Sequence, residues 1–244
     1  MTAFDDSAEY YEALANSAQR LQREGPFLLE RLGRAPGRRV VDIACGTAPH
    51  AQFFAEQGAQ VTALDFSELM IAYARRHRPH ENIRYRTGDM RRIEGGPWDF
   101  ALCLGNSLSV LSTDEDLRET FDAVHRVLAP GGLFIVQIIN YAAAANQSPR
   151  HRVERRALET SELVAVKNLV PHGEHTLLTL NFFAIHEGQT RTVSEAMLLK
   201  NWGEQDLSDA AGRAGFRILE VLGGFDARPY DPASSTDLIL TCAK

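Results

Sequence analysis

Residues 40–50 read Val40-Val41-Asp42-Ile43-Ala44-Cys45-Gly46-Thr47-Ala48-Pro49-His50. The β-branched run at the start is typical of a central parallel strand that is covered on both faces. The small residues Ala44, Gly46 and Ala48 then leave the backbone bare, so that a ligand can approach it closely. Pro49 fits the first turn of a helix, because that position needs no backbone N–H. These residues therefore predict a strand, a tight ligand-binding loop and a helix that ends at Gly58.

A second strand is expected at residues 61–65, and its last residue is Asp65. In Rossmann-type sheets an acid about 20 residues beyond the glycine loop accepts hydrogen bonds from the ribose hydroxyls of the ligand. A pyrophosphate-binding loop needs further glycines, but Ala44 and Pro49 stand at those positions. A dinucleotide is therefore a poor ligand for this loop. For this stretch alone, the alternative is an ordinary α/β protein with a tight strand-to-helix turn.

The alternation of strands and helices continues along the chain. Ser67 is expected to cap a helix, and Ser112–Glu115 to form a capping box for another that ends at residues 130–132. Gly25-Pro26 is expected to break a helical N-terminal segment, residues 4–32. Further strands are expected at 83–86, 98–104, 133–139, 216–222 and 237–242, with a helix at 204–215. The predicted fold class is α/β, with a Rossmann-like, doubly wound, mostly parallel seven-stranded sheet.

Between residues 152 and 202 the pattern changes to successive strand-like runs. These runs cover 163–170, 176–186 and 190–199, with turns at Pro171-His172-Gly173 and Glu187-Gly188 between them. We expect an antiparallel β lid, residues 150–202, that is inserted after the fifth strand and covers the ligand edge. The N-terminal segment, residues 1–32, is expected to form a helical lid. Both lids are expected to belong to a single domain that covers residues 1–244.

Composition narrows the class of function. The chain has 244 residues with 44% hydrophobic content and a net charge of −6. Without a basic face it is not expected to bind nucleic acid, and a small-molecule substrate is predicted. The acidic start, residues 1–6, and the lack of a long apolar run argue against a secretory signal and a membrane partner. Three cysteines without paired spacing predict reduced thiols in a cytoplasmic protein. The oligomeric state is left open, and a homo-oligomer is compatible with the sequence.

Three segments that contain histidine are candidates for functional sites. His50 is expected to sit near solvent at the start of a helix. The segment 151–156 mixes charges of both signs and is expected to be a solvated edge. His172 and His175 fall in a predicted turn without further ligands, so no metal site is expected.

The loop Asp42-x-Ala44-Cys45-Gly46-Thr47-Ala48 resembles the first motif of class I S-adenosylmethionine (SAM) methyltransferases, Asp/Glu-x-Gly-x-Gly-x-Gly. The strand that ends in Gly88-Asp89-Met90 is similar to another element of that family. Residues 102–107, 140–141 and 222–225 resemble glycine N-methyltransferases, and residues 191–202 look more like the amino-sugar N,N-dimethyltransferases. Residues 105–108 lack the Asn/Asp-Pro-Pro-Tyr/Phe run of the enzymes that methylate DNA or protein amides. DNA and protein amides are therefore not expected as substrates.

The resemblance implies SAM as the cofactor and assigns residues to it. The implied cofactor-binding residues are Tyr10, Tyr11, Arg20, Ala44, Gly46, Asp65, Phe66, Met70, Asp89, Met90 and Leu104. Arg20 would hold the SAM carboxylate, Asp65 the ribose, and Asp89 with Met90 the adenine. The catalytic candidates are Asn106 and Tyr141, and the candidates for substrate contact are Ser109, Ile139 and Asn140.

The predicted reaction is methyl transfer to an amine nitrogen of a small molecule. A sulfonium needs little acid–base help, so orientation and exclusion of water dominate the rate. The amine proton is expected to leave to water or to a polar neighbour such as Tyr141 or Asn106. No histidine or lysine base for a hydroxyl acceptor stands at a predicted strand end. O-methylation of a hydroxylated metabolite remains the alternative, and a SAM-binding protein without turnover is another. The acceptor and the number of methyl groups transferred are left open.

Ile139 bears on the choice of acceptor. The resembling glycine N-methyltransferases place an arginine immediately before the Asn-Tyr pair, where it can hold the amino-acid carboxylate. Isoleucine has no donor for a carboxylate, and a desolvated, unpartnered carboxylate is costly. The sequence therefore predicts that glycine is not turned over and that the acceptor presents an apolar or neutral-polar face to Ile139. Turnover of glycine would require another cation, such as Arg152 or Arg191.

Overall fold

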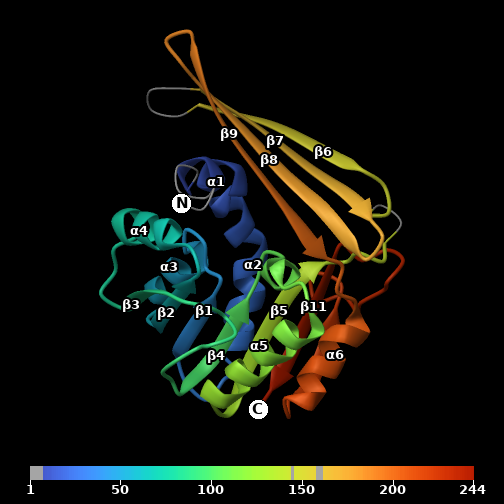
Figure 1. The fold of residues 1–244 in the computed structure, drawn as a ribbon. Helices are drawn as coiled ribbons and strands as arrows, with labels where there is room; N and C mark the ends of the chain where they lie inside the picture. The colour runs from blue at the N-terminus through green and yellow to red at the C-terminus, as the bar shows by residue number, and fades with distance from the viewer. Residues whose placement is uncertain (1–7, 144–145, 158–161) are drawn as a thin grey trace.

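The computed structural model describes residues 8–143, 146–157 and 162–244. Its main sheet has the strand order β10-β11-β5-β4-β1-β2-β3 (Figure 1). The strands are β1 (Arg39–Ile43), β2 (Gln60–Asp65), β3 (Ile83–Thr87), β4 (Trp98–Cys103), β5 (Leu128–Ile139), β10 (Arg217–Leu222) and β11 (Asp237–Ala243). Strands β1 to β5 run parallel, and β11 is antiparallel to both of its neighbours. The predicted mostly parallel seven-stranded sheet is confirmed.

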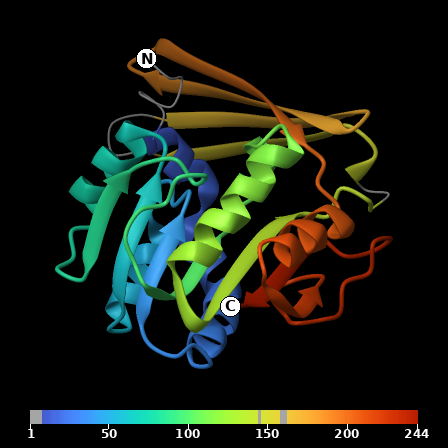
Figure 2. The same cartoon turned by 60° about the horizontal axis from the view of Figure 1, so that its bottom comes forward.

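Helices cover both faces of the main sheet (Figure 2). The helices α2 (Ser17–Leu32), α3 (Pro49–Glu56) and α4 (Glu68–His77) pack on one face, and α5 (Asp114–Val127) and α6 (Glu204–Arg213) pack on the other. In β4, Phe100 and Leu102 join the apolar core between the sheet and α2, α3 and α4. Ala101 and Cys103 join the apolar core on the other face, between the sheet and α5 and α6. Burial on both faces explains why the central strands are apolar at nearly every position. No helix within the described ranges is long and apolar enough to cross a membrane.

The path of the chain creates a ligand site at one edge of this sheet. From β1 the chain continues outward to β2 and β3, and then returns to β4 on the other side of β1. The two directions of winding leave a crevice between β1 and β4 at the carboxyl ends of the strands. The loops that follow β1, β2, β3, β4 and β5 all reach this edge.

A second sheet lies above the same edge (Figure 1). It consists of β6 (Arg150–Ala157), β7 (Glu162–His172), β8 (His175–His186) and β9 (Gln189–Lys200), antiparallel and in sequence order. The three predicted runs correspond to β7, β8 and β9, and the turn at Glu187-Gly188 lies where the sequence predicts it. Residues 158–161 of the expected lid lie outside the described residues.

Two details of the second sheet differ from the sequence-based expectation. Residues 151–156 form part of β6 and not merely a solvated edge. Their mixed charges concealed a strand, because an edge strand with one neighbour tolerates charged side chains. The turn after β7 is also shorter than predicted: Pro171 and His172 remain in the strand, and His172 pairs across the turn with His175.

The N-terminal helices differ from the expectation in where they break. Helix α2 continues through Gly25 and Pro26, because the packing of its apolar face offsets the cost of an internal proline. The break lies at Asn16, whose left-handed φ of 48° separates α2 from α1 (Ala8–Ala15). Asparagine tolerates this conformation better than most residues. Residues 4–7 of the predicted helical segment lie outside the described part of the chain.

The two predicted capping sites have different outcomes. Ser67 caps α4 as expected, because its hydroxyl accepts a hydrogen bond from the Met70 backbone N–H at 3.3 Å. The cap of α5 is Thr113, which accepts from the Asp116 N–H at 3.1 Å, so the capping box expected at Ser112–Glu115 is wrong by one residue. Helix α5 ends at Val127, and residues 130–132 already belong to β5.

Candidate functional site

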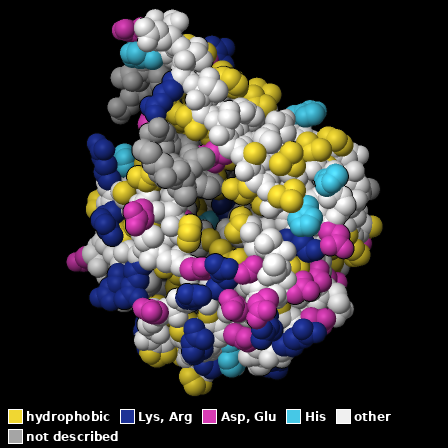
Figure 3. Space-filling model, in the orientation of Figure 1, with side chains coloured by type: hydrophobic (Ala, Val, Ile, Leu, Met, Phe, Trp, Pro, Cys, Tyr) yellow, Lys and Arg dark blue, Asp and Glu magenta, His cyan; other side chains and the backbone are white. Residues whose placement is uncertain are grey.

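A cavity of about 1210 Å³ lies between the carboxyl edge of the main sheet and the second sheet. The space-filling view shows this hollow between the two parts, with hydrophobic side chains on its walls (Figure 3). Its lining comes from the loops after β1 to β5, from α1 and α2, and from β7, β8 and β9. Pockets that bury one drug-sized ligand usually have volumes of about 300–1,000 Å³. This cavity is larger and therefore has room for a second small molecule.

The loop after β1 presents bare backbone to the cavity. Ala44, Gly46 and Ala48 have left-handed φ angles of 55°, 57° and 62°. Two alanines in this region are unusual, and such strain persists only where neighbouring contacts hold it. Here the Cys45 N–H donates to the Leu64 carbonyl at 3.0 Å, and the Ala48 N–H donates to the Cys45 carbonyl at 2.9 Å. Ala44 and Gly46 both line the cavity.

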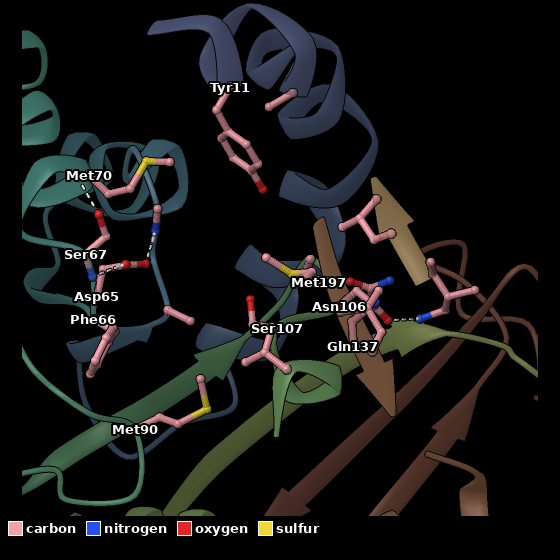
Figure 4. A pocket seen from close by; sticks show the side chains of 18 of the residues that line it. Tyr11, Asp65, Phe66, Ser67, Met70, Met90, Asn106, Ser107, Gln137 and Met197 are labelled. Atoms are coloured by element: carbon pink, nitrogen blue, oxygen red, sulfur yellow. Dashed lines mark hydrogen bonds between the residues drawn. The ribbon is translucent and has the colours of Figure 1, made fainter. Parts of the chain in front are cut away.

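Asp65 closes this loop from the neighbouring strand. Its Oδ2 accepts from the Gly46 backbone N–H at 2.7 Å, and its Oδ1 accepts from the Ser67 N–H at 2.9 Å (Figure 4). Burial raises the pKa of Asp65, and these backbone N–H groups oppose the increase. Each carboxylate oxygen has more than one acceptor site. Asp65 can therefore accept hydrogen bonds from a ligand without releasing the loop.

Apolar side chains surround the cavity beside Asp65. Phe66, Met70 and Met90 line this part, and Phe66 is 71% exposed although it is a large aromatic residue (Figure 4). Exposure of apolar side chains at a cavity wall suits a flat, partly apolar ligand group.

Asp89 also lines the cavity, but its carboxylate already has a partner. The Arg91 guanidinium donates to it at 2.6 Å and reaches Asp116 at 2.5 Å on its other side. The hydrogen bonds from Arg91 hold the pKa of Asp89 below its usual range. A ligand amino group at Asp89 would have to share the carboxylate with Arg91.

Asn106 lines the opposite part of the cavity with its amide fixed in place. Its Nδ2 donates to the Tyr141 hydroxyl at 2.7 Å, and its Oδ1 accepts from the Ile139 N–H at 2.9 Å and from the Ser109 hydroxyl at 3.2 Å. Both lone pairs of Oδ1 are therefore occupied, and one N–H of the amide remains for a ligand. Ile139 lines the cavity beside it.

Four predicted site residues line neither this cavity nor the small cavity that adjoins it. Tyr10 packs against Phe182 of the second sheet, with ring centroids 5.8 Å apart. Ser109 is fully buried, and Tyr141 lies in the core behind Asn106. Asn140 is also buried; its side chain donates to backbone carbonyls of the segment 231–235 and joins the two strand exits. These residues support the site and do not face it, because Tyr10 packs α1 on the second sheet and the Tyr141 and Ser109 hydroxyls hold the Asn106 amide.

The remaining predicted residues lie at the cavity or beside it. Tyr11 and Arg20 line the main cavity, and Tyr11 points into it from α1 (Figure 4). Leu104 lines only a small adjoining cavity of about 40 Å³ beneath the loop after β1. Within the described residues there is no cluster of three or more His, Cys, Asp or Glu side chains that could hold a metal ion.

Gln137 is a cavity residue that the sequence analysis missed. Its Oε1 accepts from the Gly105 N–H at 2.7 Å, and its Nε2 donates to Asp237 at 2.6 Å. It thereby fixes the loop after β4 to β5 and β11. The available signal was a single glutamine within the apolar run 133–139.

Glu24 was also missed, although it organises one side of the cavity. It is 1% exposed and accepts from Arg20 at 2.9 Å, from Arg23 at 3.0 Å and from His50 Nε2 at 2.7 Å. Burial alone raises the pKa of Glu24, but the hydrogen bond from His50 and the charge of Arg20 outweigh it and lower the pKa to about 2. The expectation that His50 sits near solvent is wrong, because it is 4% exposed and paired with this carboxylate.

Helix α1 is attached to the body on the other side of the cavity. Glu12 accepts a hydrogen bond from the Thr47 hydroxyl of the loop after β1, and the Arg78 guanidinium lies 2.6 Å from the same carboxylate. The opposite side of the helix packs on the second sheet through Tyr10. Helix α1 is therefore held between the body and the second sheet, next to the cavity.

Comparisons with known proteins agree with this geometry. Residues 40–132 match the family model described as "Methyltransferase domain". The chain is 26% identical over 235 residues to the dTDP-4-amino-2,3,4,6-tetradeoxy-D-glucose N,N-dimethyltransferase of Saccharopolyspora spinosa, which covers 91% of this chain and 90% of that protein. It is 30% identical over 142 residues to the glycine/sarcosine N-methyltransferase of Parasynechococcus marenigrum (strain WH8102), which covers 56% of this chain and 50% of that protein.

Solved structures show the same fold. The crystal structure of an S-adenosylmethionine-dependent methyltransferase from Clostridium acetobutylicum ATCC 824 matches with a TM-score of 0.82 at 16% identity, and the match covers 99% of both chains. The first curated relatives are matched over only about half of their length, from 42% to 57%. The resemblance to SAM methyltransferases that the sequence predicts is confirmed.

The Glu24 network leads to a prediction about stability. A glutamate with a pKa of about 2 in the folded state, against an ordinary value of 4.5, stabilises the folded state by about 3 kcal/mol at neutral pH. Because the pKa is lowered, this contribution is complete above pH ~5 and is lost as the pH falls toward 2. The advantage of the unmodified protein over Glu24→Gln in urea unfolding should therefore shrink across that pH range. Glu115→Gln, an exposed control, should show no such trend. A pH-independent difference for Glu24→Gln would contradict the assignment.

Proposed function

We propose that this chain, whose residues 40–132 match the methyltransferase-domain model, transfers a methyl group from SAM to an amine nitrogen of a small molecule. The observation that carries the proposal is the pairing of Asp65 with the Gly46 N–H at the carboxyl edge of the sheet. This pairing places the small-residue loop after β1, whose backbone is open to the cavity, beside the Asp65 carboxylate, which can still accept further hydrogen bonds. A cavity with room for a second molecule adjoins it.

The cavity residues fit SAM in the orientation that the sequence predicts. Asp65 accepts from the ribose hydroxyls, and the backbone at Ala44 and Gly46 lies beneath the methionine portion. Arg20, which Glu24 holds in position, binds the SAM carboxylate. Phe66, Met70 and Met90 contact the adenine from its apolar sides, and the adenine amino group shares Asp89 with Arg91. These assignments use only side chains and backbone that face the cavity.

The chain's own contribution to the reaction is orientation. When bound, SAM supplies an electrophilic methyl group on a sulfonium, whose thioether leaves without a proton. The second sheet and α1 act as lids that exclude water, and Asn106 holds the acceptor beside the cofactor. Because Oδ1 of Asn106 is fully occupied, the amide orients the acceptor through its free N–H. Burial raises the pKa of Tyr141, and its hydroxyl lies behind Asn106, so the amine proton leaves to water.

The length over which each relative aligns with this chain supports an amine on a small metabolite as the acceptor. The relative aligned over nine-tenths of both proteins is named for dimethylation of an amino sugar nucleotide. The relatives named for glycine and sarcosine align over about half of their length. An acceptor amine on a small metabolite is therefore a better match than glycine.

We further infer a cytoplasmic site of action and a small-molecule partner. The three cysteines are free and buried, which suits a reducing compartment. The net charge of −6 gives no electrostatic attraction to nucleic acid.

Removal of Asp65 should weaken cofactor binding. A hydrogen bond to a charged group contributes about 1.5–3 kcal/mol, so Asp65→Ala should bind SAM and its demethylated product about 10- to 100-fold more weakly. Isothermal titration calorimetry gives the affinities, and Asp226→Ala, an exposed acid remote from the cavity lining, is the matched control. Unchanged affinity in Asp65→Ala would refute the cofactor placement.

The acceptor class is tested with a panel of glycine, sarcosine, uncharged amines and hydroxylated metabolites, with product masses as the readout. We expect methylated amines, and glycine at least about 30-fold slower than the best amine, because Ile139 leaves its carboxylate unpartnered. Ile139→Arg should raise the turnover of glycine, and Ile139→Leu should not. Methylated hydroxyls would establish the O-methyltransferase alternative, and cofactor binding without any product would establish a binding protein. Efficient turnover of glycine by the unmodified protein would contradict the role of Ile139.

The lid role of α1 is tested by hydrogen exchange with and without the demethylated cofactor. We expect backbone protection to increase around Tyr10, Tyr11 and Arg20, because these residues join the cavity wall to the second sheet. Strand β4 in the core serves as the internal control and should not change. Equal protection of α1 in both states would mean that the helix is fixed packing and not a lid.

A further inference from the structure

The face of the second sheet that covers the cavity has an apolar row next to a cationic row. Leu169, Leu178 and Met197 are cross-strand partners in one row, and all three line the cavity. Lys167 lies two positions before Leu169 in β7 and pairs with Arg152 of β6. The side chains of Lys167 and Arg152 also line the cavity. Residues two apart on a strand point to the same face, so the cations and the apolar row form one roof.

Lys167 is a cation without a counter-ion in the described part of the chain. Its amino group makes no hydrogen bond or ion pair with any described residue. Burial lowers its pKa, and the positive charges of Arg152, Arg150 and Arg20 lower it further. An enclosed charge without a partner is unfavourable, and a protein usually retains one where a ligand supplies the opposite charge.

The nearest acids on the roof do not neutralise this cluster. Glu154, on the same face of β6, is shared between Arg152 and Arg156. Glu195 lies in the same cross-strand row as Lys167, but Leu180 separates them. Neighbouring strands are about 4.8 Å apart, so Glu195 is about 10 Å away along the sheet. The described roof therefore carries a net positive charge above the cavity.

The floor of the cavity carries a smaller charge of the opposite sign. Asp65, Asp89 and Asp116 line it from the main-sheet side, and Arg91 lies between the last two and pairs with both. Arg20 and Arg23, which pair with Glu24, line the cavity from α2. A cationic cofactor fits this acidic floor, and the space beneath the cationic roof remains for the second molecule. The charge distribution thus separates a site for a cation from a site for an anion within one cavity.

We infer that Lys167 and Arg152 form an anion-binding subsite, and that the amine acceptor carries a carboxylate or phosphate group remote from its nitrogen. Arginine offers a bidentate fork to either group, and lysine adds a point charge. The inference rests on the proposed function, because it identifies the second molecule as the methyl acceptor. It is compatible with a neutral acceptor surface at Ile139, because the cavity has room for an elongated molecule with its charge at the roof end.

The test is anion binding by the intact protein. Inorganic pyrophosphate and succinate are titrated calorimetrically, as probes of the phosphate and carboxylate alternatives, into the protein loaded with demethylated cofactor. Lys167→Met keeps most of the aliphatic stem and removes the charge. Arg155→Met is the matched control, because Arg155 lies on the opposite face of β6 and is 76% exposed. We expect one of the two probes to bind the unmodified protein, Lys167→Met to bind it at least about tenfold more weakly, and Arg155→Met to be unchanged. The probe that binds identifies the anionic group.

Two results would overturn the subsite: the unmodified protein binds neither probe, or Lys167→Met and Arg155→Met bind equally well. The cofactor affinity of Lys167→Met, measured in the same way, should be unchanged and shows that the variant is folded. The anion titration requires no turnover and can be repeated without cofactor. Its result therefore tests the subsite independently of whether the protein transfers methyl groups. Methylation of an amine that carries a phosphate or carboxylate group, with the same KM in Lys167→Met and the unmodified protein, would also refute the subsite while leaving the proposed function in place.

Discussion

The hydrogen bond between the Gly46 N–H and the Asp65 carboxylate joins the ends of two neighbouring strands, and the cavity depends on it. A loop with left-handed alanines at positions 44 and 48 is strained, so it needs contacts that hold it. Asp65 supplies one contact from β2, and the Leu64 carbonyl supplies another through Cys45. The same carboxylate also lines the cavity. One side chain thus couples the shape of the loop to the lining of the cavity, which explains why an acid ends this strand.

The main sheet was predictable because its signals are strong and local. Strands buried on both faces read as apolar runs, and Gly58 and Ser67 mark the ends of neighbouring helices. The failures at Pro26 and at β6 have a common cause, since both were decided by tertiary contacts. Pro26 remains helical because α2 packs on the sheet, and β6 pairs with β7 although its own sequence is dominated by charges.

The site was predictable only in part. Parallel strands bring their carboxyl ends to one edge, so Asp65, Asp89, Asn106 and Ile139 reach the cavity as expected. The spacing of residues along the sequence does not predict in which direction a side chain at a strand end points. Asn140 therefore turns into the core, and Gln137 lines the cavity instead. Residues of the roof were beyond reach for another reason: their role depends on how the second sheet docks over the main sheet, and no local pattern specifies that arrangement.

The opposed charges of floor and roof also bear on the protonation of the acceptor. Only a neutral amine has the lone pair that attacks a methyl group, whereas a free aliphatic amine is an ammonium ion at neutral pH. Next to the sulfonium charge of a bound SAM, the ammonium form would be disfavoured and the neutral form favoured, because a nearby positive charge lowers the pKa of an amine. At the roof, burial lowers the pKa of Lys167, and the neighbouring arginines lower it further. An acceptor whose anionic end binds the roof would offset the desolvation of these cations, and its amine would lose its proton to water before transfer. Such a cavity requires no basic side chain, which agrees with the occupied Asn106 amide and with Tyr141 buried behind it.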